Sequence, residues 1–187
     1  MKIRESGMPN EKIWEGFFNP ISILETLGIT NKIDSIAEFG CGFGTFTIPA
    51  AKMINGKIYG IDIEPEMLEI TKKKAREHKL DNIETEQRDF VSKGSGLDSE
   101  SVDYVMLFNI LHGEKPKKLF EESWRILKPN GIIGVIHWNN DPKTERGPPM
   151  EIRIKPEQCI ELARSSGFFN PKKYDLKPYH YGLTLKK

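Results

Sequence analysis

Three glycines at alternate positions, Gly40, Gly42 and Gly44, directly follow an apolar run of the chain. Because glycine has no Cβ and tolerates positive φ, such a loop can turn tightly and approach a ligand closely. A second apolar run, one helix length further on, ends at Asp62. A carboxylate at the end of that strand can accept hydrogen bonds from both hydroxyls of a ribose. Together these features indicate a nucleoside-binding site.

The glycine spacing indicates which kind of nucleoside is bound. Dinucleotide-binding loops have the pattern G-x-G-x-x-G and hold a pyrophosphate at a helix N-terminus. Here Thr45 stands where the third glycine of that pattern would be, and Glu38 precedes the loop. A carboxylate there would repel a pyrophosphate but can receive an ammonium, so we expect a ligand without phosphates. The alternative is a glycine-rich turn that binds nothing, and Asp62 disfavours it.

Five segments in order, separated by helix-length gaps, give the chain a family resemblance. From about residue 33 to residue 137 it resembles the class I S-adenosylmethionine-dependent methyltransferases. Within that class it looks most like the small bacterial type 11 family, which holds many enzymes of unassigned substrate. Each segment alone is a weak signal, whereas the ordered set is strong. The segments are EFGCGFG (38–44), GIDIEPEML (60–68), QRDF (87–90), DYVMLFNILH (103–112) and RILKPNG (125–131).

The predicted ends of the first two strands assign most of the S-adenosyl-L-methionine site. We expect Glu38 and the glycine loop to hold the methionine part of the cofactor. Asp62 would bind the ribose hydroxyls, because ligands of such sheets lie beyond the carboxyl ends of the strands. Ile63 and Met67 would lie against the adenine face, although Met67 fits a helix core equally well.

The resemblance adds the remaining cofactor contacts. It implies that Asp89 accepts a hydrogen bond from the adenine amino group and that the backbone of Phe90 recognises the ring edge. It also implies that Asn109 lies near the methionine tail. The predicted cofactor-binding residues are therefore Glu38, Gly40, Cys41, Gly42, Gly44, Asp62, Ile63, Met67, Asp89, Phe90 and Asn109.

Alternating strand and helix signals predict an α/β fold with a Rossmann-like, doubly wound sheet. We expect seven strands, mostly parallel, with an antiparallel pair at one edge. Turn residues at 128–131 and a polar loop over 92–101 should separate elements. The expected strands are 35–39, 57–62, 82–87, 102–108, 131–137, 168–175 and 180–186, and the expected helices are 45–54, one from Pro65, 116–127 and 156–166.

The length of 187 residues fits one methyltransferase domain. We expect residues 1–30 to form an N-terminal helical lid, interrupted by Pro20, and residues 33–137 to form the cofactor-binding core. Residues 138–187 would supply a substrate-side loop, the last helix and the edge strands. A monomer or homodimer is expected.

Composition narrows the class of partner. With 28 basic and 27 acidic side chains, the chain has no global field to attract nucleic acid. No apolar run is long enough for a membrane span, and the N-terminus lacks the apolar core of a signal peptide. Cys41 and Cys159 are too few for a disulfide framework or a four-cysteine zinc site, so we expect no metal and a cytoplasmic protein.

Methyl transfer from a sulfonium needs alignment more than electrophilic help, because the leaving group is a neutral thioether. A general base would help only if the acceptor must lose a proton. His112 and His137 stand at predicted strand ends and, titrating near neutral pH, are the candidate bases. Packing is the competing role for both, and alignment without a base is the preferred mechanism. His180 should merely begin the last strand.

The methyl acceptor is the least determined feature. The segment after residue 108 lacks the Asn/Asp-Pro-Pro-Tyr pattern that the family uses for amide and nucleobase nitrogens. Loop 138–149, with Trp138 and Arg146, is the expected substrate side, and we favour a small-molecule acceptor. The alternatives are a methyltransferase for protein or RNA, contacted by lysine-rich helices, and a non-catalytic module that binds the cofactor. Arg146 could anchor a carboxylate or a phosphate of the acceptor, but a solvated loop arginine is the plainer interpretation.

Overall fold

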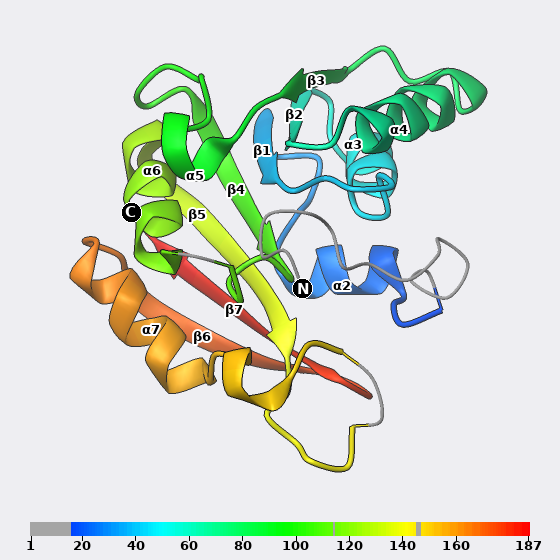
Figure 1. The fold of residues 1–187 in the computed structure, drawn as a ribbon. Coiled ribbons are helices and arrows are strands. Elements are labelled where there is room, and N and C mark those ends of the chain that lie inside the picture. The colour runs from blue at the N-terminus through cyan, green and yellow to red at the C-terminus, as the bar shows by residue number, and fades with distance from the viewer. Residues whose placement is uncertain (1–15, 114, 145–146) are drawn as a thin grey trace.

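Seven strands form one sheet in the residues that the structure, a computed structural model, describes: 16–113, 115–144 and 147–187. The strands are β1 (Ser35–Phe39), β2 (Lys57–Asp62), β3 (Ile83–Gln87), β4 (Val102–Phe108), β5 (Leu127–Trp138), β6 (Phe169–Leu176) and β7 (His180–Lys186). Their order is β3-β2-β1-β4-β5-β7-β6 (Figure 1). All pairs are parallel except those that β7 makes with β5 and with β6. The predicted fold class is confirmed.

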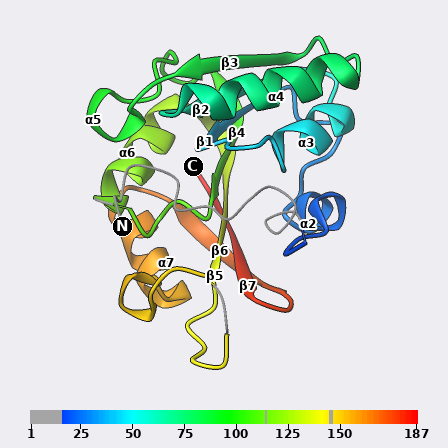
Figure 2. The ribbon, with the colours of Figure 1, turned by 45° about the vertical axis from the view of Figure 1, so that its right-hand side comes forward.

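Helices cover both faces of the sheet (Figures 1 and 2). They are α2 (Pro20–Thr26), α3 (Thr47–Met53), α4 (Pro65–Glu77), α5 (Phe90–Lys93), α6 (Pro116–Ile126), the 3-10 helix η1 (Met150–Ile152) and α7 (Pro156–Ser165). On one face α3 and α4 contact β2 and each other, and α2 contacts α3. On the other face α6 packs on β4, β5 and α7, while α7 packs on β6 and β7. This is the doubly wound arrangement that the alternating pattern predicts.

The central strands are apolar on both sides because both sides are buried. Tyr104 and Met106 of β4 belong to the core under α2 and α3, whereas Val105 and Leu107 belong to the core under α6 and α7. A parallel strand covered on both faces therefore shows a continuous apolar run instead of an alternation. The end of β4 is held beside β5 by the pairing of the two strands, which extends to Phe108 and Ile136.

The absence of a side chain at Gly134 leaves room for the contact that joins the central sheet to α2. A Cβ at this position would lie 2.1 Å from the Tyr104 hydroxyl oxygen, so no larger residue fits without a shift. The Tyr104 hydroxyl passes over Gly134 and donates to the carbonyl of Leu27, at the end of α2, over 3.0 Å. Burial raises the pKa of Tyr104, so the hydroxyl keeps its proton for this bond. Sheet and N-terminal helix are thus joined by a buried polar contact.

The predicted turn at 128–131 is instead the beginning of a strand. β5 starts at Leu127 and continues through these residues. Asn130 has φ of 65°, and the pairing of β4 with β5 shifts register between Val102 and Tyr104. Asparagine tolerates the left-handed region better than most residues. The turn-forming residues are therefore accommodated as an irregularity within the strand.

Two helix starts also differ from expectation. The polar loop expected from Ser92 overlaps α5, because the Asp89 carboxylate accepts a hydrogen bond from the Ser92 N–H over 3.2 Å and caps this short helix. Pro20, expected to interrupt a helix, instead begins α2. Asn19 caps this helix by accepting from the Ser22 N–H over 3.3 Å. Proline at the first helical position needs no backbone donor, which explains the difference.

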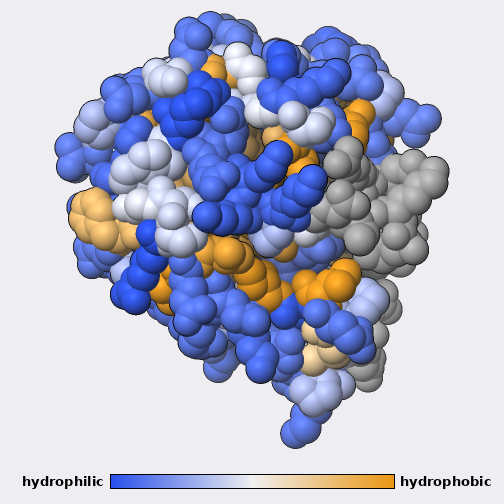
Figure 3. Space-filling view, turned by 60° about the vertical axis from the view of Figure 1, so that its left-hand side comes forward, coloured by the Kyte–Doolittle hydropathy of each residue, from blue (hydrophilic) through white to orange (hydrophobic). Residues whose placement is uncertain are grey.

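The described surface is mostly polar. Figure 3 shows a largely hydrophilic face, with a hydrophobic band below its centre and smaller hydrophobic areas elsewhere. Among the described residues the exposed large hydrophobic side chains are Ile21 and Phe169. Scattered residues of this kind are ordinary on a folded protein. Within the same part of the chain, no helix combines the length and the apolar character that a bilayer crossing requires.

Candidate active site

The glycine loop lies where the strand order reverses, between β1 and β4. Its three glycines all have positive φ: 75° at Gly40, 53° at Gly42 and 74° at Gly44. The N–H of Gly40 donates to the Ile61 carbonyl over 2.7 Å, which ties the loop to β2. A Cβ at Gly40 would lie 2.8 Å from Cδ1 of Ile110 in the turn after β4. Crevices at such a reversal are where open α/β sheets bind ligands.

Asp62 fastens this loop. The side chain is 7% exposed, and its Oδ2 accepts from the Gly42 N–H over 2.8 Å while Oδ1 accepts from the Glu64 N–H over 3.0 Å. Burial raises the pKa of Asp62, and the two backbone hydrogen bonds oppose that shift. A carboxylate has about four lone-pair positions, so each oxygen can accept one more bond. The loop-fastening role was not predicted and is compatible with ribose binding.

Glu38 is turned toward the start of α3. It is 2% exposed, and its Oε2 accepts a hydrogen bond from the Thr47 hydroxyl. Burial, with a smaller effect of Asp62, raises the pKa of Glu38 to about 8 although the Thr47 bond lowers it. The neighbouring Cys41 thiol is buried and its pKa is raised by the same cause. Glu38 thus carries a proton at neutral pH unless a cation comes close, and its predicted contact with an ammonium stays a prediction.

The residues predicted for the adenine side lie together beyond β2 and β3. Ile63 and Met67 are half-buried at the start of α4. The ring of Phe90 stacks on Phe39 at 5.3 Å, so this side chain belongs to the core and only its backbone is available for a ligand. The half-buried Asp89 is the cap of α5 described above. The sequence pair Asp89-Phe90 did not by itself predict that Asp89 caps a helix.

Asn109 ends β4 in a strained conformation. Its φ is 55°, and its backbone N–H donates to the Ile136 carbonyl over 2.8 Å, which holds it next to the end of β5. The side chain is buried, and both Nδ2 and Oδ1 lack a hydrogen-bond partner within the described ranges. Backbone strain and unsatisfied polar groups are concentrated at functional sites. The prediction that Asn109 lines a site agrees with this placement but is not tested by it.

His112 and His137 come together at the ends of β4 and β5. Their ring centroids are 5.8 Å apart with an interplanar angle of 67°. His112 Nδ1 and His137 Nε2 are buried without a hydrogen-bond partner in the part of the chain that is described. Burial lowers the pKa of His112, and burial with a repulsive effect of His112 lowers that of His137 to about 3. His137 therefore does not titrate near neutral pH, whereas for His112 the shift is downward, and the role of either histidine as a base stays a prediction.

The predicted substrate loop is fixed by an arginine that was not singled out. Trp138 is the last residue of β5, 3% exposed, and its ring lies 4.3 Å from that of His180. The Arg153 guanidinium lies 5.7 Å from the Trp138 ring and donates to the carbonyls of Pro148 (2.8 Å) and Asn139 (3.0 Å). Arg146 lies outside the described residues. Because Arg153 binds backbone carbonyls, no sequence signal identifies its partners.

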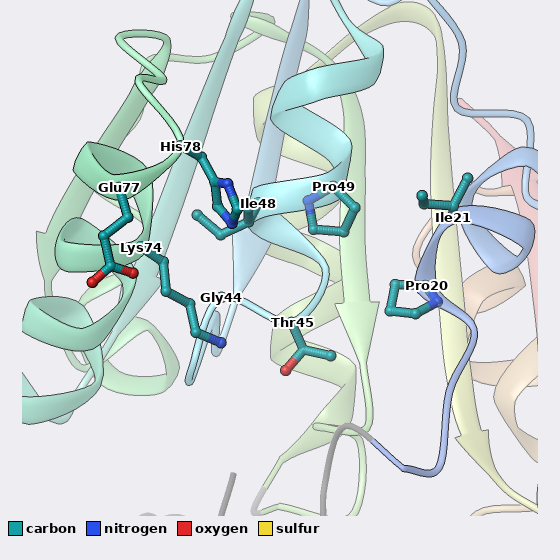
Figure 4. Close-up of a pocket in the computed structure, with 9 residues that line it drawn as sticks. All are labelled: Pro20, Ile21, Gly44, Thr45, Ile48, Pro49, Lys74, Glu77 and His78. Atoms are coloured by element: carbon teal, nitrogen blue, oxygen red, sulfur yellow. The ribbon is translucent and has the colours of Figure 1, made fainter. Parts of the chain in front are cut away.

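A surface depression of about 350 Å³ adjoins the loop from the helix side (Figure 4). It is lined by residues of α2, α3 and α4 together with Gly44 and Thr45, and Lys74 extends toward the loop. Glu38, Asp62 and Asn109 do not line it. This depression therefore shares Gly44 with the predicted cofactor site but lies on its helix side. Among the described residues, no group of three or more His, Cys, Asp or Glu is placed to hold a metal ion.

Comparison with known proteins identifies the family. A model of the methyltransferase domain matches residues 31–172. The chain belongs to the S-adenosylmethionine-dependent methyltransferases. A curated relative, an uncharacterized methyltransferase-like protein of Schizosaccharomyces pombe, is 31% identical over 128 residues, which are 67% of this chain and 47% of the relative. The chain spans between about half and two thirds of the length of the first curated relatives that it matches.

Solved methyltransferase structures share the fold over nearly the whole chain. An S-adenosylmethionine-dependent methyltransferase of Aquifex aeolicus has a TM-score of 0.83 at 23% identity, covering 95% of this chain and 93% of that one. A putative type 11 methyltransferase of Sulfolobus solfataricus has a TM-score of 0.71 at 26% identity, covering 91% and 93%. The resemblance seen in the five sequence segments is thereby confirmed at the level of the methyltransferase class.

The residues at the carboxyl edge fit the family's cofactor, S-adenosylmethionine. Three glycines with positive φ let the backbone of the loop come close to a ligand. Asn109 offers a buried amide whose two polar atoms have no partner among the described residues. Two buried carboxyl groups, Glu38 and Asp62, disfavour a pyrophosphate and suit a ligand with an ammonium and ribose hydroxyls.

Proposed function

We propose that this chain transfers the methyl group of S-adenosylmethionine to a small-molecule acceptor. The observation that carries the proposal is the glycine loop with positive φ, bonded through Gly42 to Asp62, together with Asn109, whose side-chain polar atoms have no hydrogen-bond partner in the described part of the chain. Within this proposal residues 33–137 are the cofactor core, residues 1–30 a lid, and residues 138–187 the substrate side of a single domain. Of the lid, residues 1–15 lie outside the described residues.

The cofactor, when bound, supplies an activated methyl group on a sulfonium. The residues that would hold it are the eleven predicted above, with the glycine loop and Glu38 at the methionine part and Asp62 at the ribose. Ile63, Met67 and the backbone of Phe90 would take the adenine. These assignments agree with the strand ends on which the side chains lie.

The chain's own contribution is chiefly alignment. Holding acceptor and methyl carbon in line removes orientational freedom before the reaction, which can lower the barrier by several kcal/mol. On the acceptor side the buried Trp138 would exclude water, and Arg153 holds the following segment through the carbonyls of Asn139 and Pro148. A low-dielectric site strengthens the interactions that orient the reacting groups.

Relatives leave the class of acceptor open. A ubiquinone biosynthesis O-methyltransferase of Actinobacillus pleuropneumoniae is 28% identical over 131 residues, and a ribosomal protein L11 methyltransferase of Pasteurella multocida is 29% identical over 113. We favour a small acceptor for this chain because His137 and Trp138, at the reacting edge, are buried. A macromolecular substrate would need its target group to reach these buried positions.

Transfer of label from methyl-labelled S-adenosylmethionine tests the proposal. The purified protein is incubated with a panel of hydroxyl, amine and thiol metabolites, and in parallel with total RNA and a protein extract. We expect label in one class of small molecule and background in both macromolecular fractions. Label in RNA or protein alone would overturn the acceptor class. Failure of every fraction, with no cofactor binding, would overturn the methyltransferase function itself.

A further inference from the structure

Unsatisfied polar atoms are concentrated at the ends of β4 and β5. Of seven buried side-chain nitrogens and oxygens without a hydrogen-bond partner among the described residues, four belong to Asn109, His112 and His137. An unpaired buried polar group loses its hydrogen bonds to water without replacement, and native structures contain few of them. Such a cluster in one place indicates that a ligand completes the hydrogen bonds.

The geometry restricts how a ligand meets this cluster. His112 and His137 contact each other edge to face at 5.8 Å, so nothing fits between the two rings. Asn109 is held beside the pair by its backbone bond to Ile136. Tyr181, paired with His137 across β5 and β7, lies 6.2 Å from it and closes another side. A ligand can therefore reach the two unpartnered ring nitrogens, both of them buried, only from a side that neither the other ring nor Tyr181 covers.

The protonation of the pair restricts the chemistry of the ligand. His137 Nδ1 lies 3.5 Å from the Trp138 carbonyl; assigning the ring proton to this contact leaves Nε2 as an acceptor. Burial lowers the pKa of both histidines, so both are neutral at physiological pH. The charged groups that act on His137 are His112, His180 and Arg153, all of them cationic when charged. The pair therefore suits a neutral hydrogen-bond donor and disfavours a cation.

We propose that His112 Nδ1 and His137 Nε2 share, in a three-centre hydrogen bond, the hydrogen on the acceptor atom that becomes methylated, and that the acceptor is a neutral hydroxyl or ring N–H compound such as a phenol. This inference rests on the proposed methyltransferase function and narrows its acceptor class. It assigns His137, which is fully buried, to orientation of the acceptor. It assigns His112, which is half-buried and closer to solvent, to receiving the proton.

The step balances as follows. The acceptor's lone pair forms a bond to the methyl carbon while the carbon–sulfur bond breaks, and its electron pair remains on sulfur as a neutral thioether. The positive charge passes to the acceptor, whose O–H or N–H becomes strongly acidic. Nδ1 of His112 takes this proton and the imidazolium later loses it to water. A base with a lowered pKa suffices because the acceptor becomes acidic only as the methyl group arrives.

Phenol and anisole are matched probes, because anisole is the same ring without the hydroxyl hydrogen. The protein, labelled with 15N-histidine and saturated with S-adenosylhomocysteine, is titrated with each probe and followed by nuclear magnetic resonance. We expect phenol to bind at least about tenfold more tightly than anisole, one charge-neutral hydrogen bond being of that order. His112 Nδ1 and His137 Nε2 should shift, whereas exposed His78 on α4 should not.

Affinities measured on histidine variants test the inference independently of the spectra. His112→Phe and His137→Phe should lower phenol affinity to that of anisole and leave S-adenosylhomocysteine affinity within twofold, and His78→Phe should change neither. Equal binding of the two probes, absence of phenol binding, or shifts confined to His78 would overturn the inference while S-adenosylhomocysteine still binds. Failure of S-adenosylhomocysteine to bind would instead overturn the proposed function. The wild-type titration decides the matter even where a variant does not fold.

Discussion

At the scale of single residues, the buried carboxyl groups combine structural and binding roles. Asp62 accepts from the N–H groups of Gly42 and Glu64 and still has lone pairs for a ligand. Glu38 is bonded to Thr47 and is protonated near neutral pH in the ligand-free protein. The approach of an ammonium would favour its charged form. The same side chains thus hold the loop in place and respond to what binds over it.

Asp62→Ala should weaken binding of S-adenosylhomocysteine by on the order of 2–3 kcal/mol, because hydrogen bonds to a charged group are the stronger kind. It should also lower the melting temperature, since two backbone N–H groups lose their acceptor. Asp62→Asn keeps one acceptor and should fall between. Calorimetry and thermal unfolding measure the two effects, with Asp81→Ala, at an exposed position, as the control. A folded Asp62→Ala protein with wild-type affinity would remove this residue from the site.

Sequence reasoning located these residues but not their contacts. The ends of β1, β2 and β4 were predictable, because each apolar run stops at a polar residue or at glycine. The bond from Gly42 to Asp62 joins positions far apart in the chain and has no local signal. The same holds for Arg153, whose acceptors are backbone carbonyls. The pairing of His112 with His137 likewise follows only from the register of β4 with β5.

At the scale of elements, the strands were more predictable than their boundaries. Buried parallel strands appear as continuous apolar runs, so β1, β2, β4 and β5 could be found. The start of β5 could not be found, because the residue types of Lys128-Pro129-Asn130-Gly131 are typical of a turn. In the structure they form an irregular part of the strand. α5 was not predicted, because a helix of four residues is too short to show a periodic apolar pattern. Its one sequence signal is Asp89, which caps it.

The loop between β5 and α7 should depend on Arg153. Its guanidinium bonds to carbonyls at both ends of the loop and packs against Trp138. Arg153→Gln should make residues 139–152 more susceptible to limited proteolysis and raise the apparent KM for the acceptor several-fold. Affinity for S-adenosylhomocysteine should not change, because the proposed function assigns this loop to the acceptor side. Arg164→Gln, an exposed arginine on α7, is the matched control.

A loss of cofactor affinity in Arg153→Gln would show that this loop belongs to the cofactor side instead. An unchanged proteolysis pattern would show that the two carbonyl contacts do not hold the loop.

At the scale of the whole molecule, oppositely shifted buried groups determine the pH of greatest stability. Burial lowers the pKa of His137 and of His180 from 6.5 to about 3. Each histidine contributes stability above its unfolded pKa, and this contribution is lost as the pH falls below about 6.5. Burial raises the pKa of Glu38 from 4.5 to about 8, so its contribution is complete below 4.5 and is lost as the pH rises to 8.

Between pH 4.5 and 6.5 the two histidines therefore outweigh Glu38 by one proton, and above 6.5 Glu38 is the one of these three groups whose protonation still differs between the folded and unfolded states. The ligand-free protein should be most stable near pH 6.5 and lose about 1.4 kcal/mol per pH unit on either side. Melting temperatures from about pH 5 to about pH 8.5 measure this. Glu38→Gln should flatten the alkaline side and His180→Phe the acid side. A monotonic profile in the wild-type protein would contradict the assignment of these buried groups.

The central claim is that the glycine loop and Asp62 bind S-adenosylmethionine and not a dinucleotide. Isothermal titration of the purified chain with S-adenosylhomocysteine and, separately, with NAD tests it most directly. We expect one equivalent of S-adenosylhomocysteine to bind and to raise the melting temperature, as any ligand that prefers the folded state must. NAD should do neither. Equal binding of NAD, or no binding of S-adenosylhomocysteine by the folded protein, would contradict the account.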